Sequence, residues 1–285
     1  MKKKIIIGTA QLAQNYGISN FKCKNKKREV YKILNFCYNN NLKKFDTSPH
    51  YKNQKLIGSF IKANGINDLC ISSKIPSLKG QSNKLLYLKK NIDKIFKELN
   101  IDYLDKLYFH DYNDINFINK NFDQINDILS QYKINSVGVS IYTIKHFNQI
   151  KENSIINTVQ VPLNILDRQF EKKENKKIKK VSRSIFLQGL LINSRIYTKN
   201  KYLISFNKIY FEFLKKFNIH PYNLCLDYIL SCRNFDGHTV GFNNIKQIQK
   251  ILDYFPGNSH LKLIDVLEKK IKFKNKSIIT DPRKW

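Results

Sequence analysis

Four side chains that could handle a proton stand at the ends of short apolar runs of the sequence or shortly after one. Asp46 closes one such run, and Tyr51 follows it after a Thr-Ser-Pro-His segment whose composition indicates a loop. Lys74 and His110 end two later runs. A phenol has a pKa of about 10, and a neighbouring ammonium group lowers that value. We therefore expect Tyr51 to be a proton donor tuned by Lys74, with Asp46 as the lysine's counter-charge and His110 orienting a carbonyl oxygen.

A site of this kind polarises a C=O bond and places an acid at its oxygen, but no side chain supplies a hydride. A nicotinamide cofactor does supply one. The residues therefore predict an oxidoreductase that moves a hydride between such a cofactor and a carbonyl or alcohol. Tyr51 would donate the proton in reduction and accept it in oxidation.

The elements that must position these residues follow from the alternation of short apolar runs with longer amphipathic stretches. The helical spacing of apolar residues predicts helices that include 27–40, 82–99, 114–132, 220–232 and 245–255. The short runs predict eight strands, at residues 3–8, 42–46, 68–74, 104–110, 134–140, 157–163, 180–186 and 238–242. Strands that alternate with helices pair in parallel, because parallel strands need a crossover connection.

Eight such units predict an α/β fold, the (β/α)8 TIM barrel, formed by residues 1–285 as a single domain. The C-terminal ends of the strands share one mouth in this barrel, which would bring Asp46, Lys74 and His110 together. An open doubly wound sheet is the alternative. It would carry a G-x-G-x-x-G turn after its first strand, where this chain has GTAQLAQNYG.

The formal net charge is +29, a value that suggests a polyanionic partner. Arginine is sparse, however, and lysine is spread along the whole chain, which fits a general bias toward Lys, Asn and Ile rather than a basic face. We therefore do not expect a nucleic-acid partner. The positive field would still attract cofactors and substrates that carry phosphate.

Cysteine usage and apolar patterning place the chain in the reducing cytoplasm. The five cysteines, none of them in a C-x-x-C pair, are Cys23, Cys37, Cys70, Cys225 and Cys232. Neither a metal site nor a disulfide framework is expected from them. No apolar stretch approaches the roughly 18 residues of a membrane span, and the basic start MKKKIII leads into a buried strand rather than a signal peptide. The oligomeric state cannot be read from the sequence.

Together these segments resemble the aldo/keto reductase family over nearly the whole chain. FDTSPHYKNQKLIG is similar to the family's segment around its catalytic Asp and Tyr, ISSKIP to its lysine strand and YLDKLYFHD to its histidine strand. GVSIY and VQVPLNILDR match two further segments, and SRSIFLQGLL is similar to a bacterial subgroup linked to surface-polysaccharide and flagellar-modification genes. The resemblance implies a catalytic tetrad and metal-free reduction of aldehydes or ketones, or the reverse. The tetrad residues would be Asp46, Tyr51, Lys74 and His110.

The resemblance also implies a cofactor site for NADP, with NAD as the alternative. Arg183 stands where many members have an aromatic ring on the nicotinamide, and a guanidinium plane can stack there too. The position expected to hold an Asn near the adenosine is Ile251, which leaves the choice of cofactor open. The other implied cofactor residues are Ser140 and Gln160 at the carboxamide, Leu187 and Gly189 at the pyrophosphate, and Gly241, Asn243, Asn244 and Gln247 at the adenosine end.

The chain departs from the family after Tyr51, where Lys52, Asn53, Gln54 and Lys55 replace a Gly and a Ser-Glu pair. The second helix is therefore expected to start differently. The segment FEKKENKKIKK has almost no apolar stripe, so the sixth helix is expected to be stunted. Polar, aromatic and basic loops at 11–26 and 192–203 suit a sugar-like or phosphorylated carbonyl.

Two alternative interpretations remain at this point. Tyr51 and Lys55 form a Y-x-x-x-K pair, the spacing of short-chain dehydrogenases, which would place phenol and amine on one helix face. The other alternative is a catalytically silent barrel that keeps only cofactor binding, or serves as a partner subunit.

Overall fold

The computed structural model describes residues 2–12, 17–18, 25–150, 155–175, 177–254, 261–270 and 276–285. Its eight strands are parallel and close into a barrel in chain order, with the register Ile5↔His238 to Gly8↔Gly241 joining the last strand to the first. The predicted (β/α)8 barrel is therefore confirmed, and the open sheet is excluded. The strands are β1 (Ile5–Gly8), β2 (Lys44–Asp46), β3 (Cys70–Ile75), β4 (Leu104–Phe109), β5 (Ile134–Ser140), β6 (Thr158–Pro162), β7 (Lys179–Arg183) and β8 (Gly237–Gly241).

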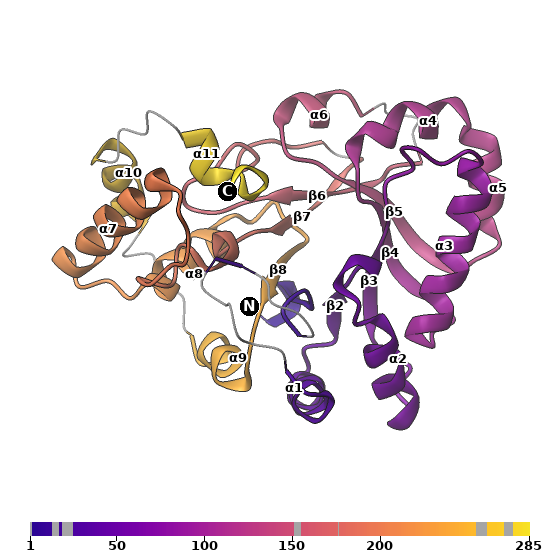
Figure 1. Ribbon diagram of the computed structural model, residues 1–285, viewed down its shortest axis with the longest axis horizontal. Helices are drawn as coiled ribbons and strands as arrows, with labels where there is room; N and C mark the ends of the chain where they lie inside the picture. The colour runs from indigo at the N-terminus through magenta and orange to yellow at the C-terminus, as the bar shows by residue number, and fades with distance from the viewer. Residues whose placement is uncertain are drawn as a thin grey trace.

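The helices surround the barrel, with α3 and α5 on one side of the molecule and α7 and α10 on the other (Figure 1). The described residues between β6 and β7 contain no helix, as the polar composition of that segment predicts. No helix among the described residues is long and apolar enough to cross a membrane. The helices are α1 (Lys27–Asn39), α2 (Gln54–Ala63), α3 (Lys84–Leu99), α4 (Ile115–Lys120), α5 (Phe122–Ser130), α6 (Ile144–Asn148), α7 (Lys201–Lys216), α8 (Pro221–Ser231), α9 (Ile245–Leu252), α10 (Leu261–Lys270) and α11 (Lys276–Thr280).

The predicted helix over 114–132 is wrong in one respect, because the chain forms two helices there. Asn121 has φ −117° and ψ 37°, outside the helical region, and separates α4 from α5. Its side-chain amide donates to the Phe117 carbonyl at 2.8 Å, and that carbonyl also accepts from Asn121 N at 3.0 Å. The break follows from the non-helical backbone of Asn121.

A fully buried tyrosine of β4 has room for its ring only because a glycine lies beside it in β5. Tyr108 pairs in register with Lys74 on one side and with Gly138 on the other, and its side chain is fully buried. A Cβ atom at Gly138 would lie 2.6 Å from both Tyr108 Cδ1 and Thr158 Cγ2. Only glycine leaves room for the ring at this position, and the packed interior confines the open cavity to one end of the barrel.

Candidate active site

The four predicted catalytic residues lie in one cavity of about 470 Å³. Lys74 Nζ donates to Asp46 Oδ1 at 2.8 Å and to Oδ2 at 2.7 Å, and also to the Thr47 carbonyl at 3.0 Å. The ion pair is buried, with side-chain exposures of 3% for the lysine and 6% for the aspartate. Its ammonium lies 5.5 Å from the centroid of the Tyr51 ring. The predicted pairing of Asp46 with Lys74 is thus present in the geometry.

The environment of Tyr51 differs from the expectation that Lys74 lowers its pKa. Burial raises the pKa of Tyr51 well above its usual value, and the nearby Asp46 carboxylate raises it further. The Arg183 guanidinium acts in the opposite direction. Lys74 is paired with both oxygens of Asp46, and its charge does not offset the effect of burial on the pKa of Tyr51. Tyr51 therefore holds its proton at neutral pH, as an acid must before it donates.

His110 follows β4 and faces the cavity beside His50, with ring centroids 5.3 Å apart. Part of His110 is exposed to solvent. Protein atoms nevertheless surround the imidazole closely, and the resulting desolvation lowers the pKa of His110. The charges of Lys74 and His50 act in the same direction. His110 is therefore a neutral imidazole at neutral pH, able to donate one hydrogen bond to a carbonyl oxygen.

The residues that depart from the family pattern after Tyr51 hold its loop in place. Thr47 Oγ1 donates to Asn53 Oδ1 at 2.9 Å, and Asn53 Nδ2 donates to the Thr9 carbonyl at 2.6 Å. Gln54, the first residue of α2, donates to Ser73 Oγ at 2.8 Å. All these side chains are buried. This polar network, which pattern reasoning missed, fixes the position of the Tyr51 loop.

The competing Y-x-x-x-K interpretation is not supported by the arrangement. Tyr51 ends a short 3₁₀ turn (Pro49–Tyr51), and α2 begins only at Gln54. Lys52, between them, has a left-handed φ of 55°, so Tyr51 and Lys55 do not share one helix face. Lys55 is exposed and does not line the cavity. A short-chain dehydrogenase would also have an open sheet, which the closed barrel excludes.

Two glutamines line the cavity with unused buried oxygens, which suits an amide ligand. Gln160 Nε2 donates to Asp46 Oδ1 at 2.9 Å, but Gln160 Oε1 is buried with no hydrogen-bond partner among the described residues. Gln11 Oε1 is likewise buried and has no hydrogen-bond partner among the described residues. Both residues and the predicted Ser140 line the cavity. A carboxamide N–H₂ group would satisfy such acceptors, so these residues fit a nicotinamide.

The loop after β7 has an unusual backbone beside the cavity. Ser184, Leu187 and Gln188 all have positive φ, at 59°, 45° and 51°, and Gly189 has φ 94°. Non-glycine residues in this conformation carry strain and cluster at ligand sites. Gln188 O accepts from Ile18 N at 3.0 Å, which joins this loop to the one after β1. Of the predicted loop 11–26, residues 13–16 and 19–24, including Cys23, lie outside the described residues.

The predicted adenosine-side residues gather at the N-terminus of α9. Asn244 caps this helix by accepting from Gln247 N at 3.0 Å, and Gln247 Oε1 accepts in turn from Asn243 N at 2.7 Å. These three residues and Gly241 line the cavity. Ile251 occupies the position where the family resemblance implies an Asn, and its apolar side chain is buried in the core.

Two further cavity residues were missed by sequence reasoning. Tyr142 follows β5, and Arg283 belongs to a 3₁₀ turn (Pro282–Lys284) near the C-terminus. Arg183 Cζ lies 4.1 Å and Arg283 Cζ 3.5 Å from the centroid of the Tyr142 ring. No local pattern predicts this cluster, because it depends on where the C-terminal segment docks.

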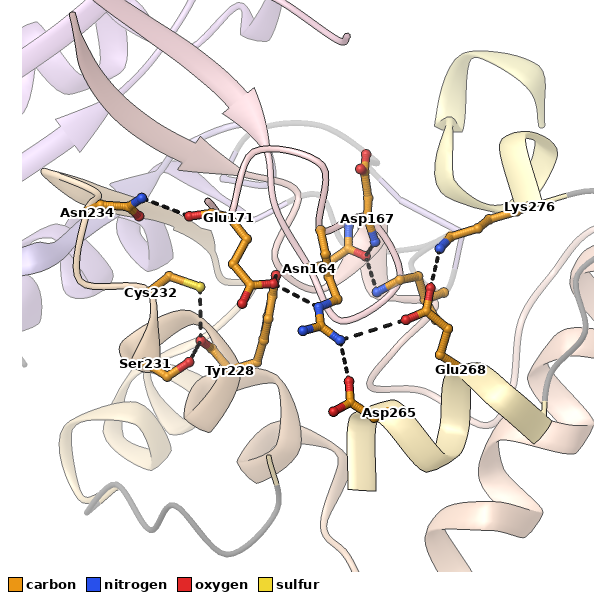
Figure 2. Close-up of polar contacts among 12 residues, drawn as sticks. Asn164, Asp167, Glu171, Tyr228, Ser231, Cys232, Asn234, Asp265, Glu268 and Lys276 are labelled. Atoms are coloured by element: carbon orange, nitrogen blue, oxygen red, sulfur yellow. Dashed lines mark hydrogen bonds and ion pairs between the residues drawn. The ribbon is translucent and has the colours of Figure 1, made fainter. Parts of the chain in front are cut away.

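An ionic network attaches the C-terminal helices to the loop between β6 and β7. Arg168 in that loop donates to Glu171 Oε2 at 2.8 Å and to Asp265 Oδ1 of α10 at 2.7 Å. Glu268 of α10 then pairs with Lys276 of α11 at 2.7 Å. The carboxylates of Glu171, in the loop, and of Asp265 and Glu268, in α10, all lie next to the Arg168 guanidinium (Figure 2). The network positions the segment that brings Arg283 to the cavity.

Comparison with known proteins assigns the family. The sequence profile of the Aldo/keto reductase family matches residues 4–264, so the chain belongs to this family. Its members are oxidoreductases that act on carbonyl compounds with nicotinamide cofactors. Aldo-keto reductase YhdN of Bacillus subtilis (strain 168) is 24% identical over 135 residues, which span 44% of this chain and 41% of that protein. The match therefore covers less than half the length of this relative.

Solved structures show the same fold over nearly the whole chain. The holo form of aldo-keto reductase AKR11C1 from Bacillus halodurans superposes with a TM-score of 0.74 at 17% identity, covering 96% of this chain and 94% of that one. The glycerol dehydrogenase AKR11B4 from Gluconobacter oxydans gives a TM-score of 0.70 at 14% identity, covering 93% and 91%. At these identities the likeness establishes the fold alone.

Proposed function

We propose that this chain is an NADP(H)-dependent oxidoreductase that interconverts a carbonyl compound and its alcohol. The observation that carries the proposal is the buried Lys74–Asp46 pair, with Tyr51 and His110 in the same cavity. Burying an ion pair is costly unless its hydrogen bonds are complete, and here Lys74 has three acceptor contacts. Such an arrangement beside an open cavity is a reason to assign chemistry to it.

In reduction, the substrate carbonyl oxygen accepts hydrogen bonds from Tyr51 Oη and from neutral His110. The Tyr51 proton passes to that oxygen as the carbon gains a hydride, which the bound cofactor supplies. The resulting tyrosinate is stabilised by the Arg183 guanidinium and by the nearby Lys74 ammonium. Asp46 holds Lys74 in place throughout, and oxidation of an alcohol is the same sequence in reverse.

For the cofactor, the proposal places the nicotinamide carboxamide at Ser140 and Gln160, whose buried Oε1 has no partner among the described residues. The pyrophosphate would approach Leu187 and Gly189 in the strained loop. The adenosine end would meet the start of α9, where a helix N-terminus favours negative charge. The residues there are Gly241, Asn243, Asn244 and Gln247.

Three finer features belong to the proposal as well. NADP is favoured over NAD because the net charge of +29 attracts the additional phosphate. A sugar-like substrate and a role in surface-polysaccharide or flagellar modification follow from the resemblance of SRSIFLQGLL and from the polar loops after β1 and β7. The proposal also includes a cytoplasmic location and a small-molecule carbonyl as the partner, and it expects no nucleic-acid partner.

The test is a titration of wild type and Tyr51→Phe with NADPH and NADH, following nicotinamide fluorescence, together with turnover of a panel of aldehydes and ketones. We expect both proteins to bind NADPH and only the wild type to turn over. NADPH binding without turnover in the wild type would favour the silent cofactor-binding barrel. Failure to bind either nucleotide would contradict the proposal.

A further inference from the structure

Arg183 is the cavity cation that lacks a carboxylate contact among the described residues. The other two cationic groups that line the cavity are both paired, Lys74 with Asp46 at 2.7 Å and Arg283 with Asp281 at 2.7 Å. Arg183 has no ion pair with any part of the chain that the structure describes. Among the described residues, no carboxylate therefore balances its positive charge at contact distance.

The hydrogen bonds of Arg183 are made to neutral oxygens. NH1 donates to Ser184 Oγ and NH2 to the Ile141 carbonyl, both at 3.3 Å. Asp167 is close enough for the Arg183 charge to oppose the rise in its pKa, but its carboxylate accepts instead from Gln169 Nε2 at 2.9 Å. A guanidinium has five N–H donors, so Arg183 retains donors for a ligand.

The position of Arg183 is fixed relative to the reacting groups. Its guanidinium lies against the Tyr142 ring, 4.1 Å from Cζ to the ring centroid, and this contact restricts where the donors can point. Arg183, Tyr51 and His110 line the same cavity. The positive charge of Arg183 also affects the pKa values of both Tyr51 and His110, so it acts at the place where a carbonyl oxygen would bind.

We propose that Arg183 selects carbonyl substrates that carry a carboxylate or phosphate group, by binding that anion in the cavity where Tyr51 and His110 meet the carbonyl oxygen. Guanidinium matches both anions in a two-pronged geometry. The inference rests on the proposed oxidoreductase function and names the substrate class for the same site. It gives Arg183 a role in substrate choice rather than the nicotinamide-stacking role that the family resemblance implies.

The experiment compares matched aldehydes that differ in charge, with NADPH at saturation. Succinic semialdehyde and butanal test the carboxylate, and glyceraldehyde 3-phosphate and glyceraldehyde test the phosphate. We expect the wild type to prefer the anionic member of at least one pair in kcat/KM, and Arg183→Met to reduce that preference by about 10- to 100-fold, mainly through KM. Arg183→Lys should retain part of it. The pair that responds identifies the anion.

Two matched variants separate a local contact from the overall positive field. Arg28→Met removes the same charge from the exposed face of α1, away from the cavity. Arg283→Met removes an arginine from the cavity that is already neutralised by Asp281. We expect Arg28→Met to leave the preference unchanged and Arg283→Met to lower it less than Arg183→Met does.

Three results would overturn the inference. One is a wild type that turns over charged and neutral aldehydes with equal kcat/KM, which would leave the proposed function standing. Another is an equal loss of preference in Arg28→Met and Arg183→Met. The third is a loss of NADPH affinity in Arg183→Met that accounts for its whole defect, which would return Arg183 to the cofactor site. No turnover of any aldehyde would instead count against the proposed function itself.

Discussion

At the scale of single residues, the roles of two lysines near Tyr51 can be separated. Lys74→Met removes the ammonium 5.5 Å from the Tyr51 ring and should lower kcat by about 10²- to 10⁴-fold, the usual range for loss of acid–base assistance. Lys55→Met changes an exposed side chain outside the cavity and should leave kcat unchanged. Steady-state kinetics on one aldehyde measures both. Activity lost in Lys55→Met but kept in Lys74→Met would reverse the assignment.

The Lys74→Met variant needs a control for folding. It leaves Asp46 buried without its partner, and an unpaired buried charge costs about 3–5 kcal/mol. The double variant Asp46→Asn/Lys74→Met removes this charge and should recover most of the stability in urea unfolding. It should still lack activity, which would separate the chemical role of the lysine from its structural one.

Residue types at and just after the strand ends were enough to predict that the tetrad residues lie close together, because the C-terminal ends of parallel strands share one mouth of the barrel. Asp46, Lys74 and His110 needed no long-range information beyond that rule. Tyr142 and Arg283 could not be predicted in the same way. Their contact depends on the docking of a segment that enters the site from the far end of the chain, which no local spacing encodes.

At the scale of elements, Gly58 shows how closely two helices pack. It lies in α2, where a Cβ atom would be 2.1 Å from the Glu98 carbonyl oxygen and 2.7 Å from the Leu99 carbonyl carbon in α3. Glycine within a helix costs about 1 kcal/mol relative to alanine, so its presence needs a packing reason. Both clashing atoms belong to the backbone and cannot rotate away.

We therefore predict that Gly58→Ala lowers the free energy of unfolding by roughly 2 kcal/mol or more, despite the better helix propensity of alanine. Urea denaturation measures this change. The neighbouring exposed residue offers a control, since Ser59→Ala in the same helix should change stability by no more than about 0.5 kcal/mol. A Gly58→Ala protein as stable as wild type would mean that α2 and α3 are not held at this separation.

The elements themselves were largely predictable, and their failures had local causes. The eight strands were predictable because short segments with apolar residues alternate with longer amphipathic stretches along the chain. The helix predicted over 114–132 is divided at Asn121, whose non-helical backbone is invisible to apolar periodicity, because that periodicity continues across it. Periodicity reports which face is buried, and it does not report where the backbone leaves the helical conformation.

At the scale of the whole molecule, a buried histidine predicts lower stability in acid. His238 in β8 is fully buried, with Nδ1 2.8 Å from Ser182 Oγ and Nε2 without a partner among the described residues. Burial lowers the pKa of His238 to about 4, and the charge of Lys4 acts in the same direction. Between this value and the unfolded pKa of about 6.5, the unfolded chain binds more protons than the folded one, so stability falls as pH falls.

The expected loss attributable to His238 is about 2 kcal/mol in the free energy of unfolding between pH 7 and pH 5. Urea unfolding at the two pH values measures it. His238→Gln removes the titrating group and should show a smaller drop over the same interval, whatever its absolute stability. An identical pH dependence in the variant and the wild type would mean that His238 is not the group responsible.

The docking of the C-terminal segment also gives the protein an optical probe of its own. The chain has a single tryptophan, Trp285, whose indole N–H donates to the Ile278 carbonyl at 3.0 Å and which stands two positions beyond Arg283. Indole emission overlaps the absorption of reduced but not oxidised nicotinamide. Emission from Trp285 would therefore pass to a bound reduced nicotinamide cofactor and not to its oxidised form, so that one fluorescence trace reports both the binding of the cofactor and the position of the segment around Trp285.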